Sequence, residues 1–80
     1  MPNLSSQRQH ASLVALGKAI REVRQSKGIS QENLALLSGV DRSYVGRIER
    51  GDNNVAFLTL ARLASALDTT VFKLAQKAKV

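Results

Sequence analysis

Residues 30–51 read SQENLALLSGVDRSYVGRIERG, which contains two short helical patterns separated by a glycine-bearing turn. Ser30 and Asp41 are suitable N-caps for the two helices, because their side-chain oxygens can accept hydrogen bonds from the first unpaired backbone N–H groups. The apolar side chains expected to face inward are Leu34, Ala35, Leu37, Val45 and Ile48. Two short helices joined in this way predict a helix-turn-helix unit, residues 30–51, at the centre of the fold.

The segments on either side of this unit also have the apolar spacing of amphipathic helices. Before it, Ser12 is a suitable cap and Gly28 suits the C-terminal end of a helix. The inward side chains of that helix are Leu13, Leu16, Ile20 and Val23. After the unit, Asn54 can cap a helix that ends near residue 67, and a last helix covers residues 71–78. No stretch alternates as a half-buried strand does, so the sequence predicts an all-α fold of five helices.

Length and composition restrict the chain to a few classes. Its 80 residues suffice for one domain only, since two separate cores would each bury too little surface. We divide the chain into a flexible N-terminal arm, residues 1–11, and a helical domain, residues 12–80. There is no cysteine and His10 is the only histidine, so no metal or cofactor is expected. No apolar run approaches the roughly 18 residues that span a bilayer, which predicts a cytoplasmic protein.

The charge of the chain points to a polyanionic partner. Twelve Lys and Arg residues against six Asp and Glu residues give a net charge of +6. Nucleic acid is the leading partner class, and an anionic membrane surface is the rival. A membrane-surface peptide needs a basic face with aromatic anchors, whereas aromatic residues are 4% of this chain. The acidic residues are scattered and no nucleophile has a base at a suitable spacing, so the chain is not expected to be an enzyme.

The residue identities within the helix-turn-helix unit resemble a known family. The runs that carry the resemblance are residues 30–35, 38–40, 44–45 and 48–51. They are similar to the Cro/CI (XRE-type) family of phage repressors and bacterial regulators, and the likeness extends from about Leu13 to Leu74. It implies a compact, lambda-repressor-like domain of five helices that binds double-stranded DNA in a bacterial or phage setting. Residues 41–45 and 48–51 look most like the controller proteins of restriction-modification systems, although plasmid and phage repressors have similar recognition helices.

The resemblance places base-contacting residues on the outward side of the second helix of the unit. These are Arg42, Ser43 and Arg47, and the side chains suit the task because arginine can donate two hydrogen bonds to guanine O6 and N7. Gly46 lies mid-helix, where glycine costs about 0.5–1 kcal/mol relative to alanine. Two interpretations stay open: the missing side chain allows close approach to DNA, or the glycine is neutral.

A second set of residues is expected to hold the DNA backbone. Gln31 lies where the family's glutamine bonds a phosphate near a helix N-terminus. The complete set of expected phosphate contacts is Gln31, Tyr44, Arg50, Asn53 and Asn54. Residues 52–54 lack the basic side chains that the family often has there, so Arg50 is expected to contribute more. The family match also pairs Arg24 with Glu49 as an internal ion pair with no base contact.

A single recognition helix makes too few base contacts to select one site in a genome, so we expect a homodimer on an inverted-repeat operator. The expected interface, on a C-terminal dimerisation helix, is formed by Val71, Phe72, Leu74 and Ala75, with part of the preceding helix. The alternative is that these residues only complete the monomer core. With no ligand domain in the sequence, no small-molecule effector is expected, and a contact with RNA polymerase is left open.

The controller-protein resemblance implies autoregulation of a restriction-modification operon, with activation at low dose and repression at high dose. The alternative is an antitoxin, or a plasmid or phage repressor, of the same fold that also binds a protein partner. An exposed apolar patch outside the dimer interface would favour that alternative.

Overall fold

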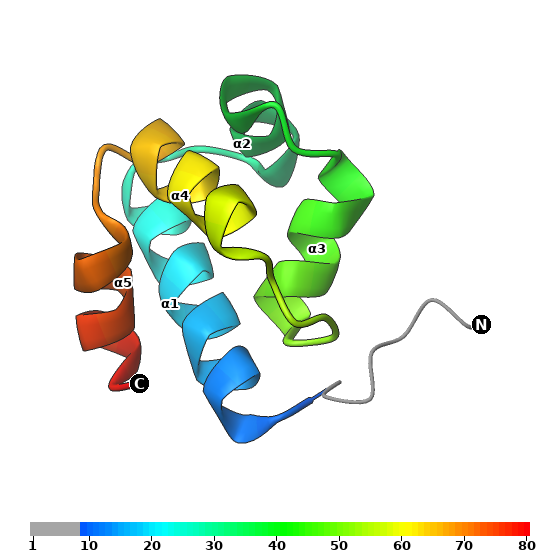
Figure 1. Ribbon diagram of the computed structural model, residues 1–80. Helices are drawn as coiled ribbons and strands as arrows, with labels where there is room; N and C mark the ends of the chain where they lie inside the picture. Colours follow the sequence, from blue (N-terminus) through cyan, green and yellow to red (C-terminus); the bar gives the residue numbers. More distant parts are fainter. Residues whose placement is uncertain (1–8) are drawn as a thin grey trace.

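The computed structural model describes residues 9–80, and in this range the chain forms five helices joined by short turns (Figure 1). The helices are α1 (Ala11–Ser26), α2 (Gln31–Ser38), α3 (Arg42–Arg50), α4 (Phe57–Ala66) and α5 (Val71–Ala78). No strand occurs in the described range, as the sequence predicts. Within the same residues, none of the helices is long and apolar enough to cross a bilayer.

The longest helix, α1, is the centre of the packing. It lies against α5 on one side and α3 on the other, while α4 packs against α2 and α5 (Figure 1). The largest fully buried side chains come from all five helices and from the residue that follows α4; they are Ile20, Leu34, Val45, Leu63, Leu67 and Leu74. The helices α1, α2 and α3 therefore share one core with the two C-terminal helices, of which α4 packs against α2 and α5 packs against α1.

The central helix-turn-helix unit forms as the sequence predicts. Ser30 Oγ accepts a hydrogen bond from the backbone N of Asn33 at 3.0 Å, which caps α2. Gly39 ends α2 with a φ of 74°, a left-handed conformation that glycine adopts without a steric penalty. Val40 is buried after the turn, and Asp41 caps α3 through the backbone N of Ser43 at 3.0 Å.

Two helix starts differ from the prediction. His10, not Ser12, caps α1: its Nδ1 accepts a hydrogen bond from the backbone N of Ser12 at 3.1 Å. Asn54 does not cap α4, which begins after Ala56 with no side-chain cap, because residues 54–56 stay outside the helix. Of the expected arm, residues 1–8 lie outside the described residues, whereas Gln9 and His10 contact the folded domain.

The contact between α1 and α3 depends on a glycine. A Cβ atom on Gly17 would lie 2.7 Å from the backbone oxygen of Glu49 and would overlap that of Ile48. A side chain at residue 17 would therefore push α3 away from α1, since both neighbours are backbone atoms at the end of a helix. Close approach at this point sets the distance between the two helices.

The burial of two leucines is the reverse of the sequence prediction. Leu37, expected inside, is 64% exposed beside Leu36 at 77%. Leu74, expected at a dimer interface, is 1% exposed and belongs to the monomer core. The interface expectation for Leu74 is therefore wrong, because its side chain is already enclosed within one chain. Phe72, two residues earlier on α5, points outward and is 71% exposed.

Shortening Leu74 tests this correction. We expect Leu74→Ala to lower the free energy of unfolding by about 2–5 kcal/mol, because it opens a cavity in the core. Phe72→Ala is the matched control on the same helix and should change monomer stability by about 0.5 kcal/mol or less. Urea denaturation at low protein concentration measures both, and equal losses in the two variants would contradict the assignment.

Candidate nucleic-acid interface

Helix α3 has one face turned inward and one turned to solvent. Val45, Ile48 and Glu49 are buried, whereas Arg42, Ser43 and Arg50 are exposed. Arg42, Gly46 and Arg50 are spaced four residues apart and form one stripe along the helix, in which Arg42 and Arg50 are exposed and Gly46 between them is buried. The buried face fixes the helix on the domain, and the outward face is left available to a partner.

The first turn of α3 is organised by Asp41. Its Oδ2 accepts hydrogen bonds from both the backbone N and the hydroxyl of Ser43. The hydroxyl of Ser43 therefore donates within the protein, and its oxygen lone pairs remain to accept from a base edge. The hydrogen bond from the Ser43 hydroxyl is the main cause that holds the pKa of the Asp41 carboxyl below its ordinary value, with smaller contributions from backbone N–H groups and Arg47.

Arg47 and Tyr44 form a stacked pair in the middle of α3. The guanidinium carbon of Arg47 lies 5.5 Å from the centroid of the Tyr44 ring, and both residues are half-buried. The Nε of Arg47 is buried without a hydrogen-bond partner among the residues that the structure describes. Stacking on an aromatic ring restrains the guanidinium group and leaves its terminal nitrogens as the atoms that can bind outside the protein.

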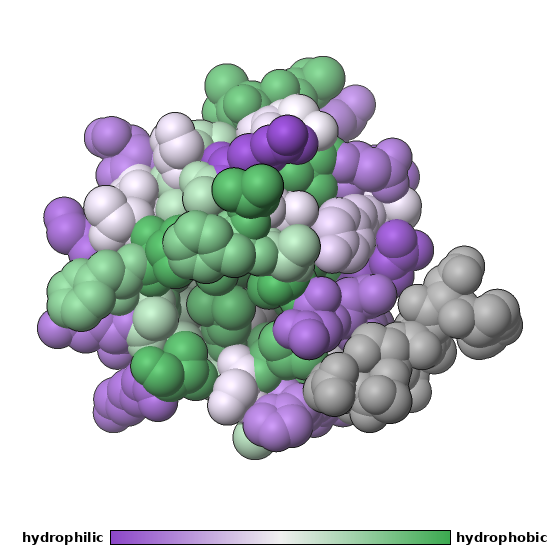
Figure 2. All heavy atoms as spheres, viewed as in Figure 1, coloured by the Kyte–Doolittle hydropathy of each residue, from purple (hydrophilic) through white to green (hydrophobic). Residues whose placement is uncertain are grey.

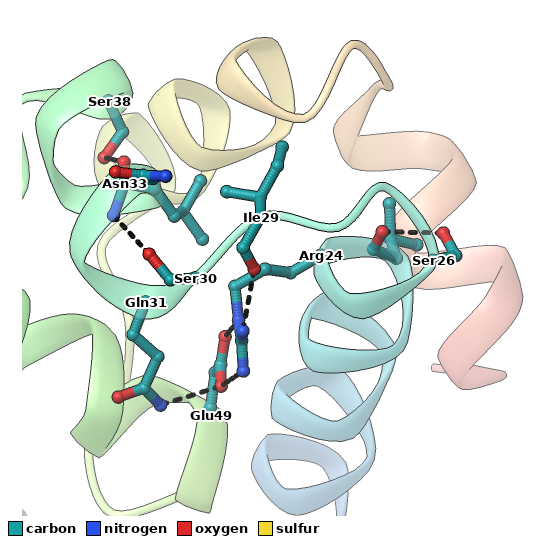
Figure 3. A network of polar contacts seen from close by, with 10 residues as sticks. Arg24, Ser26, Ile29, Ser30, Gln31, Asn33, Ser38 and Glu49 are labelled. Carbon is teal, nitrogen blue, oxygen red and sulfur yellow. Dashed lines mark hydrogen bonds and ion pairs between the residues drawn. The ribbon is translucent and has the colours of Figure 1, made fainter.

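A polar network connects α1, α2 and α3 at the inner end of the candidate interface (Figure 3). Arg24 donates from Nε to Glu49 Oε2 at 2.7 Å and from Nη2 to Oε1 at 3.0 Å, so the ion pair that the family match implies is present. Arg24 Nη1 also donates to the backbone oxygen of Ile29 at 2.9 Å. The same Glu49 Oε1 accepts from Gln31 Nε2 at 3.0 Å, which fixes the side chain of Gln31 at the start of α2.

The C-terminal end of α3 is held by a residue from the start of the chain. Gln9 donates its backbone N–H to the Gly51 oxygen at 2.7 Å and its side-chain amide to the Arg50 oxygen at 2.9 Å. The same amide donates to Asp52 Oδ1 at 2.5 Å, while Arg50 Nε donates to Asp52 Oδ2 at 3.0 Å. The side chain of Arg50 remains 61% exposed and that of Asp52 is 12% exposed.

Sequence reasoning missed the roles of Gln9 and Asp52. Asp52 was expected only to weaken the basic character of its loop, and Gln9 was included in the flexible arm. The two residues are 43 positions apart, so no local pattern connects them. The one local signal was the spacing of Asp52, an acidic residue two positions after Arg50, which could have indicated their ion pair.

The remaining predicted contacts are distributed over two surfaces. Asn53 is half-buried, with an unpartnered Oδ1 in the described part of the chain, and Asn54 is exposed beside it. On α5, Val71 and Ala75 are half-buried and Phe72 is exposed. The structure thus brings Gln31, Tyr44, Arg50 and the base-contact candidates together around α3, and it places the α5 residues on another side of the domain.

Two short helices, with the second fixed by its buried side and basic on its outer side, define the helix-turn-helix class. A match to the family described as Helix-turn-helix covers residues 20–74, and the chain belongs to this family. It is a DNA-binding transcriptional regulator of this class and not an enzyme.

Within this family, the similar proteins and solved structures include controller proteins of restriction-modification systems. Control protein C.SmaI of Serratia marcescens is 46% identical over 59 residues, which cover 74% of this chain and 70% of that protein. The restriction-modification controller protein C.AhdI of Aeromonas hydrophila has a similar crystal structure, with a TM-score of 0.80, 52% identity, and coverage of 81% of this chain and 98% of that chain. A structure of the nucleoprotein complex of C.Esp1396I matches with a TM-score of 0.77, 28% identity, and coverage of 85% and 88%.

Removal of Arg24 tests how much the buried pair contributes. Arg24→Met leaves the Glu49 carboxylate buried without its cation, and we expect a loss of about 3–5 kcal/mol in the free energy of unfolding. The double variant Arg24→Met/Glu49→Leu removes both charges and should recover most of this loss. Arg21→Met, at an exposed site on the same helix, is the control. Chemical denaturation measures all three, and an unchanged single variant would show that the pair does not hold α3.

Acid titration tests the cap at Asp41. Because its pKa is lowered in the folded state, the cap's contribution is complete above the ordinary carboxyl value of 3.8 and is lost as pH falls through the lowered value. We expect a carbon-detected NMR titration to give a pKa below 3.8 for this carboxyl. In Ser43→Ala, which lacks the hydroxyl donor, the pKa should move back toward the ordinary value. An identical titration in both proteins would rule out the hydroxyl as the cause.

Proposed function

We propose that this chain is a homodimeric controller protein that binds an inverted-repeat operator, with α3 of each subunit in the major groove. The observation that carries the proposal is the two-sided character of α3. Its inner side is locked by Glu49 to Arg24, and its outer side presents arginines that take no part in the core. A helix held in this way can present base-reading side chains at a fixed orientation.

Arg42, Ser43 and Arg47 are proposed to contact base edges, and Gln31, Tyr44, Asn53 and Asn54 to contact phosphates. Arg42 is exposed in the first turn of α3, the part of a recognition helix that enters the groove. Gln31 begins α2, where free backbone N–H groups favour an anion. Only one of the two N–H bonds of the Gln31 amide is needed for Glu49, so the other can reach a phosphate.

The apolar surface of α4 and α5 supports a dimer. Phe57 and Leu58 at the start of α4 are 67% and 73% exposed, and Phe72 on α5 is 71% exposed. Figure 2 shows hydrophobic residues gathered over α4 and extending toward α5. Exposed aromatic and leucine side chains on two packed helices are typical of a surface that a second subunit covers. The proposed interface is therefore Phe57, Leu58 and Phe72 with the half-buried Val71 and Ala75.

The controller assignment rests on the relatives named above. Control protein C.SmaI and the restriction-modification controller C.AhdI are close in sequence, and C.AhdI also in structure. We infer that the protein acts at the bacterial nucleoid and regulates its own operon, with its concentration deciding how many sites are occupied. Contact with RNA polymerase would then convert occupancy into activation, and no small-molecule effector is required.

A second candidate function is an antitoxin or a repressor with an additional protein partner. The observation that favours it is the exposed pair Leu36 and Leu37 on α2, which are separate from the α5 end of the proposed dimer interface. A pair of outward leucines has no function in the monomer core, so a second protein is one way to cover it.

Selection from a random duplex library with the purified protein tests the main proposal. We expect the bound pool to contain an inverted repeat whose half-sites lie about 34 Å apart, one turn of the double helix. Arg42→Ala should then relax the preference at one base pair by about 1–3 kcal/mol, whereas Gln31→Ala should weaken all duplexes nearly alike. If both variants weakened all sequences equally, α3 would not be the reading helix.

Sedimentation tests the interface. Phe72→Asp should shift the protein from dimer to monomer and reduce operator affinity, because a carboxylate cannot be buried unpaired in an apolar interface. The matched control is Leu36→Gln/Leu37→Gln, which alters the second exposed apolar pair and should leave the dimer intact. If the control variant dissociated the dimer instead, the interface would lie on α2. Leu36 and Leu37 would then be covered by the second subunit and would no longer indicate a separate protein partner.

A further inference from the structure

The guanidinium group of Arg50 packs against Gly46, a close contact that binding to a phosphate does not require. Its side chain folds back along α3, so that a Cβ atom placed on Gly46 would lie only 3.2 Å from Nη1 of Arg50. The same Cβ position would be 3.7 Å from Oε1 of Gln31. The guanidinium of Arg50 thus lies against the buried Gly46, and a methyl group at residue 46 would be in closer than ordinary contact with it.

The orientation of this guanidinium is fixed from its inner edge. Nε donates to Asp52 Oδ2 at 3.0 Å, and the other oxygen of the carboxylate accepts from Gln9. Gln9 is itself anchored to the backbone oxygens of Arg50 and Gly51. Because Nε is bound to the carboxylate and the side chain is 61% exposed, the terminal Nη1 and Nη2 atoms are left for an external partner, and a pair of parallel N–H donors matches O6 and N7 of guanine.

We propose that Arg50 reads a guanine in the major groove, and that Asp52, held by Gln9, is the positioning residue that presents it. This inference rests on the proposed function and changes the expected role of Arg50 from backbone contact to base contact. It also accounts for Gly46, since the glycine lets the guanidinium lie close to the helix backbone without a tight contact to a Cβ atom. Arg50 would then read a base from the same stripe of α3 as Arg42, with the phosphate contact Gln31 beside it at the start of α2.

Two variants and one control, compared with the wild-type chain in the same duplex selection, test the proposal. Arg50→Lys keeps the charge but loses the paired donors, so preference for one G·C pair in each half-site should fall about tenfold while affinity for random duplex stays within about twofold. Asp52→Asn should weaken the same base-pair preference, because a neutral amide restrains the guanidinium less strongly. Arg62→Lys, at an exposed site on α4, is the control and should change nothing.

Gly46→Ala separates positioning from folding. Alanine is the better helix former, so the thermal midpoint should stay the same or rise, while the new methyl group pushes on Nη1 of Arg50 and the same G·C preference falls. A merely structural role for Gly46 would leave the motif unchanged.

The outcomes of these selections separately test base contact by Arg50, its positioning by Asp52 and Gly46, and operator binding itself. An unchanged motif in Arg50→Lys, with all duplexes weakened equally, would restrict Arg50 to phosphate and overturn the proposal. Loss of the preference in Arg50→Lys alone, with Asp52→Asn and Gly46→Ala unaffected, would overturn the positioning role. A wild-type selection without any motif would remove the proposed operator function itself, and a wild-type motif that survives in Arg50→Lys, Asp52→Asn and Gly46→Ala would remove only this inference.

Discussion

The ion pair between Arg24 and Glu49 is the interaction on which the orientation of the recognition helix depends. It joins α1 to α3 with two hydrogen bonds, and Glu49 extends it to α2 through Gln31. The backbone near Glu49 also lies against Gly17, so the same residue is fixed through both its side chain and its main chain. A purely apolar contact would allow α3 to slide or rotate at little cost, whereas a bidentate pair permits one geometry.

The two ends of α3 are restrained by different means. At the start, Asp41 uses a local cap within the helix-turn-helix unit. At the end, Gln9 reaches across from the first part of the chain and supplies donors to carbonyl groups that a helix C-terminus leaves unpaired. Both restraints involve polar groups close to the outward face, so the atoms that hold the helix are also neighbours of the atoms proposed to read DNA.

Local sequence signals predicted the helices, whereas contacts between residues distant in the sequence determined which side chains are buried and how the end of α3 is held. Apolar spacing and the caps at Ser30 and Asp41 gave five helices and the central unit, because these features act within one turn of backbone. The Arg24–Glu49 pair was available only through family resemblance. Spacing could not show that Leu74 is enclosed and Leu37 is not, since a short helix with apolar residues on several sides has more than one face that could be buried. The contact of Gln9 with Asp52 had no precursor in the local pattern.

The two-sided construction of α3 has a consequence for how this domain can acquire new targets. Inward residues carry the fold, so the exposed Arg42 can be replaced without disturbing the core, whereas Ser43 also donates to the Asp41 cap and Arg47 packs half-buried on Tyr44. Residues 46, 50 and 52 behave differently, because the space at Gly46 and the carboxylate of Asp52 are both needed for one conformation of Arg50. Changes of specificity, whether natural or engineered, would therefore proceed one residue at a time at the start of the helix and as a linked set of three at its end.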